Sequence, residues 1–322
     1  MTEGGGLSSI NSLRYSRDSP LVSGIALGPD KLHQTHQTHQ IRLTNNYIRR
    51  LRYNRHMTQT IAISNQAGGV GKTTTTINLG GALANEGHDV LLIDADPQGT
   101  LTEGTGFRDL YDQKIPSLHQ VMADPSRTEE INDIVQHHDE FDVIPANKAM
   151  DGLKDMLVTQ VANSEMRLKI AINELEYCYD FILIDCPPDL SQILDNALLA
   201  AESVLIPVEA TRRSIRAIEK MNEEIDYLTN SFPGQIETID ILGIVINSVE
   251  SVQNNDTKQM IEFFNDAPYD VFQVPDRVAI RRAWNNGVSI FTHEDTAKTE
   301  DAREAYTEIA AMLERHTAEV EA

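Results

Sequence analysis

The 322-residue chain carries a formal net charge of −22, with 40% hydrophobic residues and only two cysteines. This length suits one large α/β domain or two small ones, and the hydrophobic fraction is enough for a substantial core. The composition excludes a membrane span, because no apolar run reaches about 18 residues. It also excludes a disulfide framework and a four-cysteine metal site. Without a secretory signal at its start, the chain is expected in a reducing cytoplasm.

The net charge is strongly negative, and lysine is scarce among the basic residues, with nine lysines against eighteen arginines. An acidic, lysine-poor surface is what we expect in molar salt, where the Debye length falls to about 3 Å and self-repulsion is screened. We therefore infer a halophilic source, with an ordinary acidic protein as the alternative. Any contact with DNA would need a local basic patch.

Residues 1–56 differ from the rest, with three acidic residues against eight lysines or arginines and a polar HQTHQTHQ repeat. Such a composition cannot bury enough apolar surface to fold alone. We predict a disordered basic and polar leader over residues 1–56 and one folded domain over residues 57–322. Alternatively, the leader is not translated and Met57 begins the protein.

The first expected strand, residues 61–64, leads through a glycine-rich turn into a helix over residues 73–86, which Gly87 ends. Glycines let backbone N–H groups point at phosphate oxygens, and the helix N-terminus adds a favourable dipole. We predict a nucleotide site in which Lys72 pairs with the β- and γ-phosphates and the Thr73 hydroxyl binds Mg²⁺. The residues expected around the phosphates are Gly68, Gly69, Val70, Gly71, Lys72, Thr73 and Thr74.

The second expected strand, residues 88–96, ends in Asp94 and Asp96. Residues two apart share a face in strict strand geometry, although the chain leaving the strand can change this. A carboxylate beside a γ-phosphate can orient an attacking water. Alternatively, Asp94 caps the strand or the next turn.

After a strand over residues 141–146 and a helix over residues 164–177, a third carboxylate follows an apolar strand. Residues 179–188 form this strand, and Asp185 follows four apolar residues. Such an aspartate is the usual partner of Mg²⁺ in P-loop enzymes, often through water. We expect Cys186, next in the chain, to be a small core residue.

A helix over residues 191–201 and a strand over residues 203–209 precede a helix over residues 214–228 that begins among basic side chains. Such clusters stand out in an acidic chain and could bind DNA phosphates without reading sequence. The alternative is internal pairing with nearby carboxylates such as Glu209, Glu219, Glu223 or Asp276. The first cluster contains Arg212, Arg213, Arg216 and Lys220, and the second contains Arg277, Arg281 and Arg282.

Strands over residues 239–248 and 271–275 and a closing amphipathic helix over residues 297–315 complete the pattern. Apolar strands alternating with helices predict an α/β fold, a mostly parallel twisted sheet with helices on both faces. Ligands of such sheets bind beyond the carboxyl ends of the strands, where the three polar motifs fall.

The motifs SNQAGGVGKTTTT, VLLIDADPQG and YDFILIDCPP resemble, in order and spacing, those of the ParA-type partition ATPases of the deviant Walker A P-loop family. The resemblance covers about residue 58 to the C-terminus. It implies ATP hydrolysis with Mg²⁺, an ATP-dependent homodimer on non-specific DNA, and a ParB-like stimulating partner. It therefore implies a nucleoid-associated switch in plasmid or chromosome segregation.

The same resemblance implies roles for single residues. Lys72 would hold phosphates and Asp96 would position the hydrolytic water, whereas Thr73, Asp94 and Asp185 would serve the metal. Asn247 and Pro275 fall where the family packs the adenine. Septum-site MinD proteins are disfavoured by the PQG after Asp96 and by the acidic tail, which anionic lipid would repel. A ligase-type synthetase is disfavoured by the same PQG and by the absence of a substrate-domain insertion.

One position departs from the family, whose pattern KGGVGKT has a lysine where this chain has Ala67. In the family that lysine reaches the phosphates of the partner subunit, and a comparable arginine finger is worth roughly 10³ to 10⁵ in rate. Another cation could replace it, hydrolysis could be slow, or the switch could be lost. The retained Lys72, Asp96 and Asp185 favour the first two. The alternative function is a nucleotide-binding scaffold with little or no hydrolysis.

Overall fold

The computed structural model describes residues 58–159, 163–250, 253–293 and 299–320. The predicted leader over residues 1–56 and the alternative start at Met57 lie outside the described residues. In the described part of the chain, no helix has the length and apolar character that crossing a bilayer requires.

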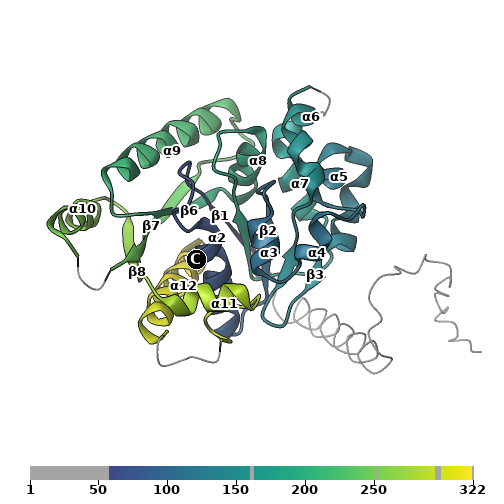
Figure 1. The fold of residues 1–322 in the computed structure, drawn as a ribbon. Helices are drawn as coiled ribbons and strands as arrows, with labels where there is room; N and C mark the ends of the chain where they lie inside the picture. Colours follow the sequence, from purple (N-terminus) through teal and green to yellow (C-terminus); the bar gives the residue numbers. More distant parts are fainter. Residues whose placement is uncertain (1–57, 160–162, 251–252, 294–298, 321–322) are drawn as a thin grey trace, which may run out of the picture. The chain divides into compact units, whose positions relative to one another are not determined.

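An eight-stranded sheet forms the centre of the domain, in the order β3-β4-β2-β5-β1-β6-β7-β8 (Figure 1). All neighbouring strands run parallel except β3 and β4, which pair antiparallel at one edge. The predicted α/β fold is confirmed. The strands are β1 (Gln59–Ile63), β2 (Val90–Asp94), β3 (Gln136–His137), β4 (Asp142–Ile144), β5 (Phe181–Asp185), β6 (Ser203–Val208), β7 (Asp240–Val249) and β8 (Asp270–Pro275).

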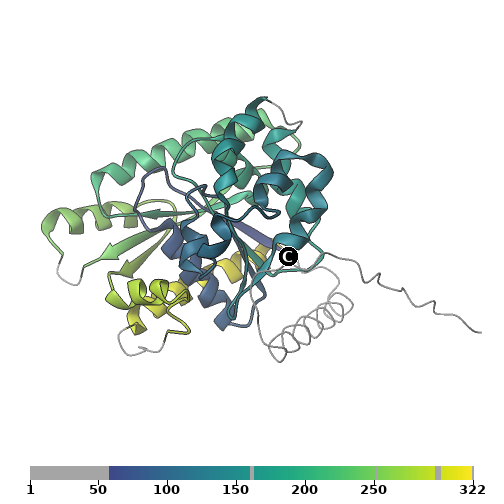
Figure 2. The ribbon, with the colours of Figure 1, turned by 45° about the vertical axis from the view of Figure 1, so that its right-hand side comes forward.

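Helices cover both faces of the sheet, which explains why the central strands are apolar on both sides. In β2, Leu91 and Ile93 belong to the core on one face, whereas Val90 and Leu92 belong to the core on the other. Figures 1 and 2 show α8 and α9 on one side and α2, α11 and α12 on the opposite side. The long helices are α2 (Lys72–Asn85), α8 (Gln192–Ala201), α9 (Arg212–Ser231), α10 (Asn255–Asn265), α11 (Val278–Asn285) and α12 (Glu300–Val320).

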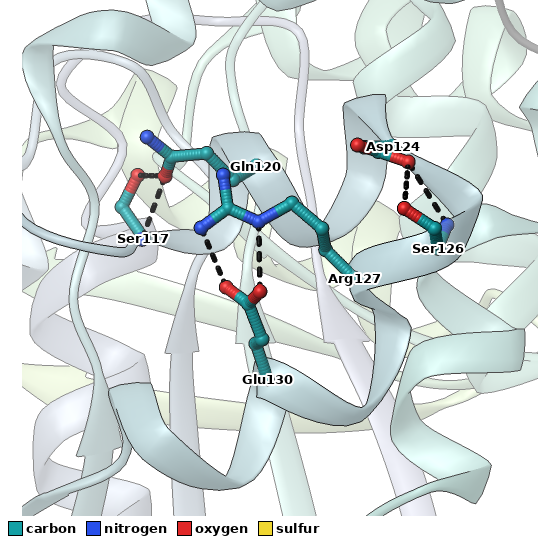
Figure 3. Close-up of polar contacts among 6 residues, drawn as sticks. All are labelled: Ser117, Gln120, Asp124, Ser126, Arg127 and Glu130. Carbon is teal, nitrogen blue, oxygen red and sulfur yellow. Dashed lines mark hydrogen bonds and ion pairs between the residues drawn. The ribbon is translucent and has the colours of Figure 1, made fainter. Parts of the chain in front are cut away.

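The structure contains several short helices, most of which the sequence prediction did not include, and two of them, α5 (Leu118–Ala123) and η1 (Pro125–Ile134), begin at local caps. At Ser117 the backbone N–H donates to the Gln120 side chain at 2.8 Å, and Asp124 accepts the N–H of Ser126 at 2.9 Å (Figure 3). These bonds satisfy amide groups that a helix start leaves unpaired. The short elements are α3 (Thr100–Gly104), α4 (Arg108–Tyr111), α5 (Leu118–Ala123), η1 (Pro125–Ile134), η2 (Lys148–Gly152), α6 (Leu153–Thr159), η3 (Ser164–Met166) and α7 (Arg167–Asn173).

Several predicted helices have different bounds in the structure, among them the helix expected over residues 214–228, which spans Arg212–Ser231 as α9. The helix expected over residues 164–177 divides into η3 and the seven-residue α7. The closing helix continues beyond the expected end at residue 315, to Val320. None of these differences affects the sheet.

The strand order places the three polar motifs side by side. β5 lies between β2 and β1, with Asp185 in register with Asp94 on one side and with Ile63 on the other. The glycine-rich turn follows Ile63 directly. All three chain segments therefore leave the sheet at the carboxyl ends of neighbouring parallel strands.

Candidate nucleotide site

The glycine-rich turn between β1 and α2 has the backbone geometry that its glycines permit. Gly69 and Gly71 have φ of 78° and 91°, a left-handed region that other residues rarely adopt. Gly71 is the N-cap of α2, which begins at Lys72. The Lys72 side chain turns back along the turn, and its Nζ donates to the Ala67 carbonyl at 3.2 Å.

The other residues predicted to surround the phosphates differ in their exposure to solvent. Gly68 and Gly69 are exposed, Val70 is buried, and Thr73 and Thr74 are half-buried. An open turn ending at a helix N-terminus is a ready-made site for a phosphate anion.

Asp185, the last residue of β5, lies directly beside Thr73. The Thr73 hydroxyl donates to Asp185 Oδ2 at 2.7 Å. The other oxygen, Oδ1, is buried without a hydrogen-bond partner in the structure. A buried carboxylate oxygen without a partner is costly, so a ligand is expected to engage it.

Asp94 and Asp96 have different environments, although they are only two residues apart. Asp94 is fully buried, and its Oδ2 accepts the Thr102 N–H at 2.7 Å and the Thr102 hydroxyl at 2.6 Å. Its Oδ1 accepts the N–H of Asp96 at 3.3 Å. Asp94 therefore caps α3, as the alternative interpretation held, whereas Asp96 is half-buried beyond the strand end.

Burial is the main cause that raises the pKa values of all three carboxylates. Burial raises the pKa of Asp185 to about 7, against the opposing Thr73 hydrogen bond and with the help of the Asp96 charge. Burial, followed by the charge of Asp185, raises the pKa of Asp94 well above its ordinary value. Burial also raises the pKa of Asp96, whereas the Gln98 N–H and Lys72 oppose the rise. The site thus favours an added cation.

Mg²⁺ fits this donor set. The Thr73 hydroxyl and the unpartnered Asp185 oxygen are hard oxygen ligands at the mouth of a phosphate-binding turn. Among the described residues, no cluster of three or more His, Cys, Asp or Glu side chains could hold a metal alone. Mg²⁺ commonly binds through one or two carboxylates together with substrate phosphates and water, so a small protein donor set is sufficient.

Two asparagines hold the glycine-rich turn in place, a role that the sequence analysis missed. Asn247 in β7 donates from Nδ2 to the Val70 carbonyl at 2.9 Å and to the Thr75 hydroxyl at 3.1 Å. Asn65 donates to the Pro207 carbonyl at 2.7 Å and accepts the Ala67 N–H at 2.8 Å. The bonds of Asn247 to Val70 and Thr75 and the bond of Asn65 to Pro207 join segments far apart in the sequence, so no local sequence signal could have shown them.

The two residues expected near the adenine lie on neighbouring strands. Asn247 is buried in β7, and Pro275 is the half-buried last residue of β8, where it pairs with Val249. The amide nitrogen of Asn247 is engaged by the turn, which leaves its Oδ1 for a ligand.

The two basic clusters differ in their ion pairing. Arg213, Arg216 and Lys220 are exposed on α9, and none has a carboxylate within ion-pair distance among the described residues. In the second cluster, Arg281 pairs with Asp276 at 2.9 Å and Arg277 pairs with Asp301. Arg282 is exposed and also has an interaction partner. Internal pairing therefore applies to the second cluster rather than to the first.

Comparison with known proteins agrees with this geometry. A family model described as an AAA domain matches residues 58–238. The chain is 30% identical over 256 residues to the sporulation initiation inhibitor protein Soj of Bacillus subtilis (strain 168), covering 79% of this chain and 97% of Soj. It is 32% identical over 241 residues to the chromosome partitioning protein ParA of Myxococcus xanthus (strain DK1622), covering 74% and 82%.

A solved structure of cobyrinic acid a,c-diamide synthase from Mycobacterium smegmatis, with bound ADP and magnesium, is also similar. Its TM-score is 0.65 at 28% sequence identity, and the match covers 81% of this chain and 95% of that one.

Proposed function

Because the chain belongs to the family of ParA/Soj-type partition ATPases, we propose that it is an ATP-dependent dimeric switch that binds DNA during plasmid or chromosome segregation. The observation that carries the proposal is the meeting of three motifs at one sheet edge. There Lys72, Thr73 and Asp185 surround an open glycine-rich turn.

In the proposed reaction, a water oxygen attacks the γ-phosphorus of ATP. The bond from phosphorus to the β–γ bridging oxygen breaks, and its electron pair leaves with ADP. Asp96 accepts a hydrogen bond from the water, and burial, which raises its pKa, makes it a better proton acceptor than an exposed carboxylate. Lys72 and the amides of the turn stabilise the charge on the phosphates.

Thr73 and Asp185 would hold Mg²⁺, which when bound neutralises charge on the phosphate oxygens. Asp94 would contribute mainly by position, because its oxygens already accept hydrogen bonds from Thr102 and Asp96. Asn247 and Pro275 would contact the adenine from β7 and β8.

The DNA contact is proposed for the basic cluster on α9, whose side chains lack carboxylate partners among the described residues. Arg281 and Arg282 would contribute less, since Arg281 is already paired with Asp276. ATP would promote the homodimer, and a ParB-like partner would stimulate hydrolysis and release. These steps place the protein on the nucleoid in the cytoplasm.

Two other functions compete with this proposal. A nucleotide-binding scaffold with little hydrolysis is favoured by Ala67, which leaves one expected cation out of the turn. The similarity to cobyrinic acid a,c-diamide synthase favours a synthetase. Two partition relatives that the chain covers over most of their length favour the switch over the synthetase.

The test is a set of binding and phosphate-release assays in molar KCl with ATP and Mg²⁺. Lys72→Ala should abolish ATP binding, whereas Asp96→Ala should keep ATP binding and lose phosphate release by roughly 10²-fold or more. Lys148→Ala, an exposed lysine in η2, is the matched control and should behave like the wild type. ATP binding that survives Lys72→Ala would refute the proposed site. Wild-type binding without phosphate release would favour the scaffold.

A further inference from the structure

A second lysine lies beside the segment that follows β5. Lys154, on α6, forms an ion pair with Asp189 in the segment that leaves β5 four residues after Asp185. No motif marks Lys154, and 35 residues separate it from its partner. Its position therefore emerges only from the fold.

The α6 helix is anchored so that Lys154 reaches the loop after β5. Leu153 and Leu157 are buried in the core, whereas Lys154 and Asp189 remain 41% and 45% exposed. An ion pair with this exposure contributes little to stability and exchanges readily. The flexible four-carbon stem of lysine lets the ammonium group move to a better anion.

Lys154 and Lys72 act on the same carboxylate. Burial is the main cause of the raised pKa of Asp96, and the charges of Lys72 and Lys154 both oppose it, whereas Asp189 reinforces it. The charge of Lys154 thus lowers the pKa of the group proposed to orient water. A triphosphate beside Asp96 would attract the same ammonium group more strongly than one carboxylate does.

The site contains more carboxylates than cations, so a further cation would stabilise a bound triphosphate. Asp94, Asp96 and Asp185 gather at the strand ends, and Lys72 is the cation of the glycine-rich turn, because Ala67 supplies none. Extra negative charge develops on the γ-phosphate oxygens and on the leaving bridging oxygen during transfer. One lysine and one Mg²⁺ leave part of that charge unbalanced.

We propose that Lys154 leaves Asp189 and binds the γ-phosphate of the ATP held in its own protomer. There it supplies the positive charge that Ala67 lacks. This inference rests on the proposed ATPase function. Two exposed apolar side chains flank the ion pair, Val158 one helical turn beyond Lys154 and Leu190 next to Asp189. Covering them in the proposed ATP-bound dimer would exclude water and strengthen the contact.

The first test measures phosphate release at saturating ATP in molar KCl. Lys154→Ala should lower turnover by at least roughly tenfold, whereas Lys154→Arg should stay within about threefold of the wild type. Lys148→Ala, in the same stretch of chain, should have no effect. Ala67→Lys added to Lys154→Ala should restore most of the turnover, because it returns a cation to the turn. Turnover of Lys154→Ala within about twofold of the wild type would overturn the proposal.

A second set of variants separates phosphate binding from a structural ion pair. Asp189→Asn frees Lys154 and should keep or raise turnover, and the double variant Lys154→Ala/Asp189→Asn should stay as slow as Lys154→Ala. Loss of turnover in Asp189→Asn equal to that in Lys154→Ala would make the ion pair itself the important feature. In a mixture of the two single variants, a Lys72→Ala chain could supply Lys154 to a Lys154→Ala chain that holds ATP. Recovery of turnover in that mixture would refute action of Lys154 within one protomer.

A binding measurement distinguishes failure of this inference from failure of the proposed function. Lys154→Ala should weaken binding of a non-hydrolysable ATP analogue by roughly tenfold and leave ADP binding unchanged, because ADP lacks the γ-phosphate. Equal affinity of the wild type and Lys154→Ala for the analogue would refute the role of Lys154. Absence of ATP binding in the wild type would instead refute the proposed function.

Discussion

Ala67 is the residue that most distinguishes this phosphate-binding turn. Its backbone is fully used, because the N–H donates to Asn65 and the carbonyl accepts from Lys72. Its methyl group carries no charge, so the position shapes the turn and leaves charge stabilisation to other residues. We therefore expect the departure to affect the rate of hydrolysis rather than the binding of ATP.

Ala67→Lys should raise phosphate release in the wild-type background, because a second cation would lower the energy of the charged transition state. We expect an increase of about threefold to tenfold, smaller than in the Lys154→Ala background. Phosphate release at saturating ATP measures it, with Ala67→Met as the control for side-chain length. Unchanged turnover in Ala67→Lys would argue that the turn does not lack a cation.

At the scale of elements, α9 combines a buried and a basic surface. Its buried residues Ser214, Ala217, Met221, Ile225 and Leu228 recur every three or four positions and pack against the domain. The exposed basic residues lie near the N-terminal end of the same helix. Because the apolar face fixes the helix, substitutions on the basic face should leave the fold unchanged.

Arg213→Ala combined with Arg216→Ala should weaken retention on non-specific DNA by roughly tenfold and lower its salt dependence, because each phosphate contact releases counterions. ATP binding should not change. The matched control is Arg277→Ala with Arg281→Ala, which removes the same charge from two arginines that already have carboxylate partners. Equal retention by the wild type and the α9 variant at one salt concentration would exclude this surface.

At the scale of the whole domain, His88 joins segments that are far apart in the sequence. Its Nε2 lies 2.6 Å from Glu314 Oε1 in α12, its Nδ1 lies 3.7 Å from Asp180 Oδ2, and its ring packs edge-on against Phe181. No local pattern in the sequence indicates these contacts. His88 is thus a half-buried link between the sheet and the closing helix.

His88 should make the stability of the domain depend on pH. The nearby Asp180 carboxylate is the largest cause of its raised pKa, opposed by burial and assisted by Glu314. Since the folded state binds the proton more tightly, the stabilisation is complete below the unfolded pKa of about 6.5 and is lost as pH rises through the raised folded value.

We expect His88→Gln to lower the free energy of unfolding by about 1 kcal/mol at pH 6 and by less at pH 9. Denaturant titrations at both pH values in constant molar KCl measure the difference. His119→Gln is the control, because burial lowers the pKa of His119 and reverses the sign of its contribution. The same loss at both pH values would contradict the protonated link.

The sequence alone determined the sheet, its mostly parallel character and the position of the glycine-rich turn before α2. These follow from apolar strands buried on both faces and from Gly69, Gly71 and Lys72, whose roles are local. The capped helices between β2 and β5 could not be predicted in the same way, because single side chains such as Gln120 start them.

Only the tertiary structure decided how the polar residues divide their roles. Asp94 and Asp96 are nearly adjacent in sequence, yet Asp94 is buried and accepts two hydrogen bonds from Thr102 in α3, whereas Asp96 is half-buried beyond the strand end. Lys154 meets Asp189 only because folding packs α6 against α5 and α8 and so brings it to the segment that leaves β5. The role of a side chain depends on neighbours that folding brings together. Strands and turns depend on consecutive residues, so they can be predicted from the sequence.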